Sequence, residues 1–297
     1  MRDADVRTVR SFNRLVTERV GALEDRYLAT DRPLGEARLL WEIGRGRAEV
    51  RELRRRLALD SGYLSRLLQS LEAAGLIRVR PSGDDRRVRL VELTAAGRTE
   101  RALLDRRSDE LARSFLEPLD EHRRARLVEA MTEVEQLLTA PLVAIDVLDP
   151  DAPAARACLA AYAAELARRF ESGFDPRRNP MPADEVRPPS GLFLVATLHH
   201  EPVGCGALKL HGDGPAELAR IWVSERVRGL GLGRRLVAEL EGRAAETGAT
   251  TVRLDTNGAL TEAIALYRSA GYREVEPFND NPYAHHWFEK PLGPVPG

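Results

Sequence analysis

The chain has 297 residues, more than one hydrophobic core usually organises, so its length predicts two domains of roughly 150 residues each. A net charge of -1 excludes attraction of nucleic acid by overall charge, and the lack of any apolar run of about 18 residues excludes a membrane-spanning helix. The two cysteines, Cys158 and Cys205, are far apart and the N-terminus has no apolar signal region, so we expect a soluble cytoplasmic protein without disulfides or structural zinc.

The first part of the chain is predicted to be helical. Apolar residues recur at helical spacing from Val6 to Leu28, which predicts one long amphipathic helix ended by Arg32 and Pro33. Three shorter helices in close succession indicate a helix-turn-helix, and they are expected at residues 34–43, 50–57 and 63–74.

A β-hairpin is predicted next. Residues 76–80 and 87–93 alternate between apolar and polar side chains around the turn-forming stretch 81–85. Positive charge is concentrated on this hairpin by five arginines, Arg78, Arg80, Arg86, Arg87 and Arg89. We expect the hairpin to act as a wing whose tip reaches an adjacent minor groove of DNA.

The pattern changes at Pro141. Before it, two helical stretches at about 95–116 and 120–139 carry apolar stripes, and with the first helix they are predicted to form a dimerisation bundle. After it, strands alternate with helices, which predicts an α/β domain. We therefore expect an N-terminal domain at 1–140 and a C-terminal domain at 141–297.

In the second domain we expect strands at 142–148, 192–198, 203–210, 217–223 and 251–257, and helices at 153–170, 232–247 and 260–270. The segment 175–189 is rich in proline and charge, which predicts a loop over a substrate site.

The third short helix has the pattern of a DNA recognition helix. Its apolar residues at 64, 67, 68 and 71 define a buried face, and the side chains expected to point outward are Ser61, Tyr63, Ser65, Arg66 and Gln69. Such polar groups hydrogen-bond to base edges and phosphates in a major groove. An ordinary solvated helix face is the alternative, and it applies equally to the four arginines at 51 and 54–56.

The order of these elements resembles the MarR family of regulators over about the first 140 residues. The resemblance is carried by Leu53, Asp60-Ser61-Gly62, residues 71–77, Asp85-Arg86-Arg87 and residues 93–97. It implies a mainly α winged helix-turn-helix with a β-hairpin wing, in a homodimer that reads pseudo-palindromic double-stranded DNA. It also implies that Arg86 or Arg87 enters the minor groove and that Asp85 orients the arginine.

A glycine-rich turn opens the helix expected at 232–247. Gly229, Gly231 and Gly233 let the backbone approach a diphosphate closely, and successive N–H groups at the positive end of the helix dipole bind phosphate oxygens without a metal. The preceding strands form an antiparallel meander, which argues against a dinucleotide-binding fold.

The combination of Arg228-x-x-Gly231-x-Gly233, Asn257 and residues 266–272 resembles the GNAT acetyltransferase family over about residues 142–292. The resemblance implies a mixed, mostly antiparallel sheet that splits between the strands 217–223 and 252–255, with the acetyl-pantetheine arm of acetyl-CoA in the split. The implied cofactor-binding residues are Ile221, Trp222, Val223, Arg228, Gly229, Leu230, Gly231, Leu232, Gly233, Arg234 and Asn257.

Transfer of an acetyl group to an amine needs a base for the ammonium and an acid for the departing thiolate. Glu217, on a strand beside the split, is the candidate base, acting through water; a surface carboxylate is the alternative. Tyr267 is the candidate acid, because the sequence around it resembles the GNAT motif; a half-buried packing residue is the alternative.

Several polar groups near the C-terminal end have open roles. Asn257 is expected to contact the cofactor, although capping of the next helix is the alternative. Cys205 is expected to be a small core residue. The stretch 278–290 is either the rim of a substrate loop or, from Tyr283 to Phe288, a final strand. His285 and His286 point to opposite strand faces, so we expect no metal site.

The sequence thus predicts a transcriptional regulator that is also an acetyl-CoA-dependent N-acetyltransferase. Its predicted partners are DNA, acetyl-CoA, an amine and a second copy of the chain, without a membrane. A non-catalytic repressor that senses acetyl-CoA or an amine is one alternative. An enzyme that uses the winged helix only to dimerise or to bind protein is another, which the arginines of the wing argue against.

Overall fold

The computed structural model describes residues 2–22, 27–44, 48–83, 87–212 and 214–293. Within them the chain forms two units, Met1–Ala130 and Met131–Gly297, each with its own buried cluster of apolar side chains. The domain boundary at residue 140 stays a prediction.

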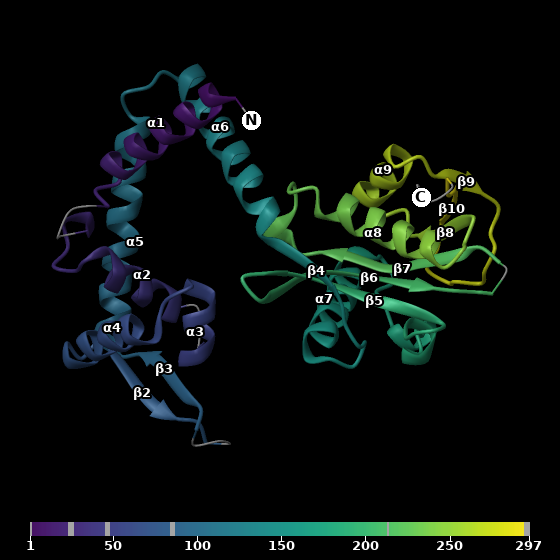
Figure 1. Cartoon of the computed structure of the whole chain (residues 1–297), viewed down its shortest axis with the longest axis horizontal. Coiled ribbons are helices and arrows are strands. Elements are labelled where there is room, and N and C mark those ends of the chain that lie inside the picture. Colours follow the sequence, from purple (N-terminus) through teal and green to yellow (C-terminus); the bar gives the residue numbers. More distant parts are fainter. Residues whose placement is uncertain (1, 23–26, 45–47, 84–86, 213, 294–297) are drawn as a thin grey trace. The chain divides into compact units, whose positions relative to one another are not determined.

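Helices make up most of the first unit (Figure 1). They are α1 (Asp3–Arg19), α2 (Leu34–Ile43), α3 (Val50–Leu57), α4 (Ser61–Ala73), α5 (Ala95–Leu116) and the first part of α6 (Glu121–Thr139), with a short 3-10 turn at Tyr27–Ala29. The rest of α6, from Met131, belongs to the second unit. The strands β1 (Ala48–Glu49), β2 (Ile77–Pro81) and β3 (Arg89–Leu93) form a small antiparallel sheet in the order β1-β3-β2. This confirms the mainly α winged helix-turn-helix and its hairpin, and adds β1, which was not predicted.

The first helix is shorter than predicted. Apolar spacing predicted a helix to Leu28, but α1 ends at Arg19. Gly21 then adopts a φ of 63°, the left-handed conformation in which glycine commonly stops a helix. The prediction was wrong because it followed the apolar spacing through this glycine.

The helix-turn-helix is held by capping and by leucine packing. The Asp60 carboxylate caps α4 by accepting a 2.9 Å hydrogen bond from the backbone N–H of Tyr63. The side of α4 that faces the core buries Leu64, Leu67, Leu68 and Leu71, in one cluster with apolar side chains of α2 and α3. Because these leucines are buried, the polar side chains between them face solvent.

The second unit is built on a mixed sheet. Its strands are β4 (Val143–Val147), β5 (Gly191–Leu198), β6 (Glu201–Lys209), β7 (Ala216–Val223), β8 (Thr251–Thr256), β9 (Arg273–Val275) and β10 (His286–Pro291). In the described part of the chain their order is β4-β5-β6-β7-β8-β10-β9, and every pairing is antiparallel except that of β7 with β8. The predicted α/β fold with a mostly antiparallel sheet is confirmed.

Helices cover both faces of this sheet. Figure 1 shows α7 (Pro153–Arg169) on one face and α8 (Leu232–Glu246) with α9 (Thr261–Ser269) on the other. Successive side chains of β8 point to opposite faces of the sheet. Val252 and Leu254 belong to the cluster with α8 and α9, so Arg253 and Asp255 face the side of α7.

Two irregularities open the sheet between β7 and β8. The strands pair only at Ala216 with Val252 and at Glu217 with Arg253. Further along β7 the register with β6 shifts at a bulge, where Arg220 has a φ of 54°. Beyond the last paired residues the two strands have no further pairing, which leaves backbone groups at the end of β7 available to a ligand.

Candidate functional site

Two cavities lie beside the open part of the sheet. One, of about 380 Å³, is lined by the loop residues 178–180 and 279–283 together with Glu217 and Asp255, and we name it the acceptor cavity. The other, of about 510 Å³, is lined by residues 221–223 and the glycine-rich turn, and we name it the cofactor cavity. The residues common to both are Tyr162, Leu166, Ile221, Leu260, Ala263 and Tyr267. The two cavities therefore meet at a pair of tyrosines next to the β7 bulge.

The glycine-rich turn has the backbone geometry that its sequence predicts. Gly229 and Gly231 have φ values of 83° and 71°, and Gly231 is the residue before α8, where no side chain caps the helix. The first N–H groups of α8 are thus left for another acceptor at the positive end of the helix dipole. This turn and the cavity beside it fit a diphosphate.

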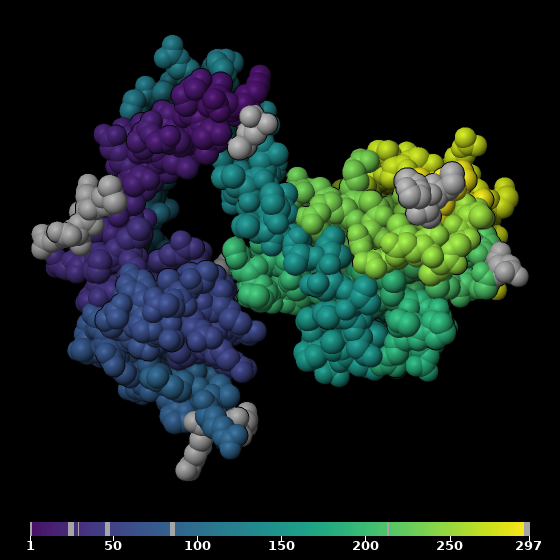
Figure 2. Space-filling view, in the orientation of Figure 1, coloured from purple at the N-terminus to yellow at the C-terminus, as the bar shows by residue number. Residues whose placement is uncertain are grey.

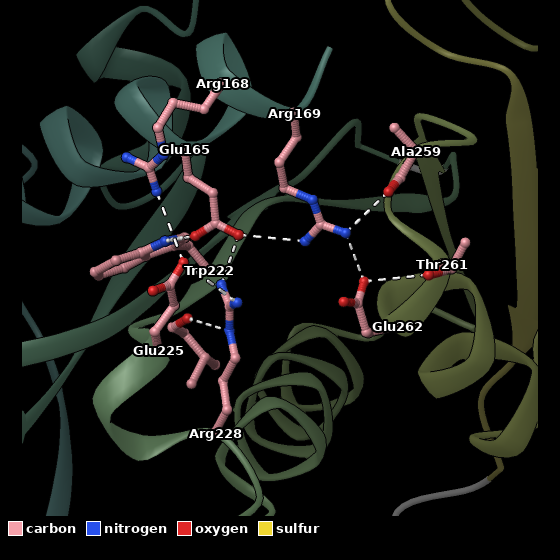
Figure 3. Close-up of polar contacts among 10 residues, drawn as sticks. Glu165, Arg168, Arg169, Trp222, Glu225, Arg228, Ala259, Thr261 and Glu262 are labelled. Atoms are coloured by element: carbon pink, nitrogen blue, oxygen red, sulfur yellow. Dashed lines mark hydrogen bonds and ion pairs between the residues drawn. The ribbon is translucent and has the colours of Figure 1, made fainter.

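A buried carboxylate organises the wall of the cofactor cavity (Figure 3). Glu165 on α7 accepts hydrogen bonds from the indole Nε1 of Trp222 at 2.8 Å, from Nη2 of Arg228 at 2.5 Å and from Nη1 of Arg169 at 3.3 Å. Arg169 also donates to Glu262, at 2.7 Å. One carboxylate therefore joins α7, the end of β7, the glycine-rich turn and, through Arg169, α9.

These donors keep Glu165 ionised. Burial alone raises the pKa of its carboxyl, but the hydrogen bonds from Trp222 and Arg228 outweigh that effect, and the net pKa is lowered. Two arginines, Arg169 and Arg228, are thereby fixed at the cofactor cavity. Guanidinium groups there suit the negative charge of a phosphorylated ligand.

The two tyrosines at the junction of the cavities are protonated phenols at neutral pH. Burial raises the pKa of Tyr267 well above its usual range, and the nearby Tyr162 and Asp255 raise it further. Burial also raises the pKa of Tyr162, against an opposing effect of Arg220. Among the described residues no group hydrogen-bonds to the Tyr267 hydroxyl, so its proton is available to a ligand.

The candidate base, Glu217, lies in the acceptor cavity within a cluster of basic side chains. Its side chain is 15% exposed and its carboxylate oxygens lie 3.7 Å from Nζ of Lys209, 3.6 Å from Nε2 of His211 and 3.9 Å from Nη2 of Arg253. Glu217 lies four residues before Ile221 on β7, and both residues line the acceptor cavity.

Asn257 lines the acceptor cavity. Its Nδ2 donates to the carbonyl of Tyr283 at 2.7 Å, and its Oδ1 accepts from the backbone N–H of Ala259 at 2.9 Å. Both ends of the carboxamide are therefore used within the protein. The N-cap of α9 is Leu260 and no side chain caps that helix, so the alternative role of Asn257 as a helix cap is wrong, and its contact with the cofactor stays a prediction.

The other predicted cofactor residues surround the cofactor cavity. Ile221, Trp222, Val223, Arg228, Gly229, Gly231, Leu232, Gly233 and Arg234 line it. Leu230 lies within the same turn and packs against the apolar cluster of the sheet. Arg234 donates to Ser269 at 2.8 Å.

The C-terminal stretch contains both a loop and a strand. The last strand, β10, begins at His286 and not at Tyr283, because residues 279–283 form part of the acceptor cavity instead. His285 accepts from the N–H of Gly258 and His286 contacts Glu274, so the two rings have separate partners. Cys205 is fully buried. Among the described residues no group of three or more His, Cys, Asp and Glu is placed to hold a metal ion.

The surface of α4 presents the side chains predicted to contact DNA. Ser61, Tyr63, Ser65, Arg66 and Gln69 are all exposed. The guanidinium of Arg66 lies over the ring of Tyr63, at 5.8 Å from its centroid. The strands β2 and β3 project from the body of this unit (Figure 2). Together with the exposed polar side chains of α4, this hairpin has the form of a winged helix surface for DNA.

Only some of the arginines predicted to contact DNA are exposed. The exposed arginines are Arg78, Arg80, Arg87 and Arg89 on the wing and Arg51, Arg54 and Arg55 on α3, and of these Arg80 forms an ion pair with Glu92 at 2.8 Å. Arg56 is largely buried against Glu42, which makes it a structural residue. Asp85 and Arg86 lie outside the described residues.

Sequence reasoning missed Tyr162, Glu165, Arg169 and Asp255. The first three lie on one face of α7, at a spacing of three and four residues. A glutamate among the alanines of that helix was a signal of a buried polar role, but its partners are far along the chain: Trp222 is 57 residues away.

No helix in the described ranges is long and apolar enough to cross a membrane.

Comparison with known proteins assigns both units. The acetyltransferase (GNAT) family matches residues 159–272, and the MarR family matches residues 30–88. A protein named as an uncharacterised N-acetyltransferase of Schizosaccharomyces pombe is 36% identical over 115 residues, which cover 38% of this chain and 69% of that protein. An IAA acetyltransferase of Azospirillum brasilense is 36% identical over 109 residues, 35% of this chain and 70% of that protein.

Among solved structures, one similar structure is that of FabT of Streptococcus pneumoniae in complex with DNA. The match covers 46% of this chain and 94% of the FabT chain, with 25% sequence identity and a TM-score of 0.36. By the family match and the S. pombe relative, the chain belongs to the GNAT family of N-acetyltransferases, and its first unit carries a winged helix-turn-helix of the MarR family.

Proposed function

We propose that the chain is a bifunctional cytoplasmic protein, a transcriptional regulator whose second unit transfers the acetyl group of acetyl-CoA to an amine. The observation that carries the enzymatic part is the meeting of the two cavities at Tyr267, beside the bulge of β7. One cavity contains the glycine-rich turn for a diphosphate, and the other contains carboxylates for an amine.

Acetyl-CoA supplies the acetyl group as an activated thioester. Backbone N–H groups from Gly229 to Gly233, with Arg169 and Arg228 nearby, bind its diphosphate. Backbone groups of Ile221 to Val223 hold the pantetheine arm and polarise the thioester carbonyl. The unpaired stretch of β7 and the uncapped start of α8 support this placement.

Glu217 takes one proton from the acceptor ammonium through water, which frees the lone pair for attack on the thioester carbon. The C–N bond forms, the C–S bond breaks, and Tyr267 gives its proton to the departing thiolate. The nitrogen then loses its second proton, which restores the Tyr267 phenol, and Glu217 releases the first proton to solvent. The products are an acetamide and coenzyme A. The position of Tyr267 at the junction of the cavities and its raised pKa support its role as the acid.

The first unit binds double-stranded DNA as a homodimer. The exposed face of α4 and the arginines of the wing support contact with DNA. Exposed apolar side chains along α1, Val9 at 58% and Leu15 at 57%, support burial of that helix against a second copy. Light scattering should give twice the mass of the chain, and a monomer would contradict the homodimer.

A thiol-release assay tests the enzymatic proposal. Wild-type protein with acetyl-CoA and a panel of amines should release coenzyme A in step with an acetylated product seen by mass spectrometry. Calorimetry run in parallel measures binding of acetyl-CoA itself. If acetyl-CoA binds but no amine is acetylated, the unit is a sensor without turnover; if it does not bind, the assignment of the cofactor cavity is wrong.

A further inference from the structure

The acceptor cavity contains a carboxylate that no basic side chain neutralises. Asp255, at the end of β8, accepts hydrogen bonds from Nδ2 of Asn279 at 2.7 Å and Nδ2 of Asn281 at 2.5 Å. A carboxylate has about four acceptor positions, so roughly two remain. In the described ranges of the chain no Lys, Arg or His lies within ion-pair distance of it.

The two carboxamides are fixed in the orientation that presents their N–H groups to Asp255. Oδ1 of Asn279 accepts from the indole Nε1 of Trp287 at 2.9 Å, and Oδ1 of Asn281 accepts from the backbone N–H of Tyr283 at 3.1 Å. Because each oxygen already has a donor, each NH₂ group must face Asp255. The carboxylate is thus held in place and presents its free lone pairs to a cation.

A cation without an acidic partner lies in the same cavity. Arg220, on the bulge of β7, donates through Nη2 to the carbonyl of Asn179 at 2.5 Å, and its guanidinium lies 5.7 Å from the ring centroid of Tyr162. Within the described residues no carboxylate lies within ion-pair distance of Arg220. A guanidinium has five N–H donors, so a bidentate contact to a ligand carboxylate remains possible.

Asp255 and Arg220 line the acceptor cavity together with Tyr162, and the guanidinium of Arg220 lies against the ring of that tyrosine. Both act on Tyr162: burial raises its pKa most, Arg220 opposes that rise and Asp255 adds to it. Glu217 contacts Lys209, and the two other charged residues that line the cavity, Arg178 and Asp280, are exposed. Among the described residues of this cavity without an ion-pair partner, Asp255 and Arg220 are the half-buried anion and cation that a ligand meets.

Part of the remaining wall is aromatic. Phe170, Phe174 and Tyr283 pack together with ring centroids 4.9 to 6.0 Å apart, and all three line the acceptor cavity. Such a surface accommodates an apolar or aromatic group.

We infer that the acceptor is a free α-amino acid with an apolar side chain, whose ammonium contacts Asp255, whose carboxylate contacts Arg220 and whose side chain packs on Phe170, Phe174 and Tyr283. This inference rests on the acetyl transfer proposed above and names its substrate class. In an α-amino acid the two charges are separated by two bonds, so both can be bound within one cavity whose wall contains Arg220 and Asp255. A lysine side chain within a protein carries no neighbouring carboxylate and would leave Arg220 without a partner.

Matched acceptors test the inference on the unmodified full-length chain. L-phenylalanine and L-leucine carry both charges, L-phenylalaninamide lacks the carboxylate charge, and phenethylamine lacks the carboxyl group entirely. We expect kcat/KM for L-phenylalanine to exceed that for its amide by at least about tenfold, the factor that 1.4 kcal/mol of a charged contact supplies. An amide or amine used equally well, with acetyl-CoA bound, would overturn the amino-acid inference and leave the acetyltransferase intact.

Two variants locate the contacts. Asp255→Asn should raise the KM for L-phenylalanine at least about tenfold while the KM for acetyl-CoA stays unchanged. Arg220→Gln should lower activity on L-phenylalanine and spare phenethylamine, so the preference for a carboxylate disappears. Asp146→Asn on β4 and Arg156→Gln on α7 make the same chemical changes at exposed positions outside both cavities and should change neither value.

Different outcomes distinguish a wrong substrate contact from a wrong enzymatic assignment. If Arg220→Gln lowers activity on phenethylamine as much as on L-phenylalanine, Arg220 is structural and the carboxylate contact is wrong. If acetyl-CoA fails to bind wild-type protein in calorimetry, the proposed function and this inference both fall. The comparison of acid with amide on wild-type protein does not depend on the folding of any variant.

Discussion

The Glu165 carboxylate accepts a 2.8 Å hydrogen bond from the indole of Trp222, and so ties α7 to the end of β7 beside the cofactor cavity. Since Arg228 donates to the same carboxylate, the glycine-rich turn is held through one buried acid. Replacement of that acid should therefore change both the stability of the unit and the position of the turn.

Glu165→Gln should lower the free energy of unfolding of the second unit by about 2 kcal/mol at pH 7, the scale of a lost charged hydrogen bond. The pKa of Glu165 is lowered in the folded protein, so its stabilisation is present above the unfolded value of about 4.3 and is lost as the pH falls through the folded value. Urea unfolding at pH 7 and below pH 4 measures this. A loss of equal size at both pH values would contradict it, and exposed Glu171→Gln is the control.

Tyr267→Phe should lower kcat by about 100-fold with little change in the KM for acetyl-CoA, because only protonation of the thiolate is lost. The pKa of Tyr267 is raised by burial, so its phenol stays protonated through the assay range. Wild-type kcat should therefore not fall between pH 8 and pH 10 through loss of the Tyr267 proton. The pH profiles of wild type and Tyr267→Phe should have the same shape over that range. Steady-state kinetics across that range checks both statements, and an unchanged kcat would exclude Tyr267 as the acid.

Gly231→Ala should raise the Kd of acetyl-CoA about tenfold. An alanine at a φ of 71° costs roughly 1–2 kcal/mol, and relief of that strain turns the amides away from the diphosphate. Gly242→Ala is the matched control: it lies within α8, where an added Cβ meets nothing within 4 Å, and should stabilise the helix by up to about 1 kcal/mol without an effect on binding. Calorimetry that gives equal Kd values for the two variants would contradict this role of Gly231.

Arg66→Ala should weaken binding of a random DNA duplex and lower the slope of log Kd against log salt by about one, if its guanidinium neutralises one phosphate. Fluorescence anisotropy at several salt concentrations measures the slope. Arg106→Ala, at an exposed position on α5, is the control and should leave it unchanged. An identical slope for wild type and Arg66→Ala would remove Arg66 from the DNA surface.

Local spacing was enough to predict most of the fold. The start of α8 after Gly231, the end of the recognition helix near Gly75 and the strands of the meander all follow from patterns within a few residues. The first helix was overextended because its apolar spacing continues past Gly21, whose left-handed conformation ends it.

The residues that line the cofactor cavity could be named for the same reason, since the glycine-rich turn is one continuous segment, and their contact with acetyl-CoA stays a prediction. The acceptor side was not, because its groups come together only through the sheet. Asp255 meets Asn279 and Asn281, which are 24 and 26 residues away, and neither spacing has a helical or strand period. Arg220 could not be placed either, because the bulge that positions it has no signature in its own sequence.

A crystal structure of the chain with acetyl-CoA is the most direct test of how the cofactor cavity binds acetyl-CoA. It should show the diphosphate against the backbone N–H groups of Gly229 to Gly233, and the thioester between Ile221 and the Tyr267 hydroxyl. A diphosphate bound elsewhere, or a thioester outside the junction of the two cavities, would contradict the catalytic assignment.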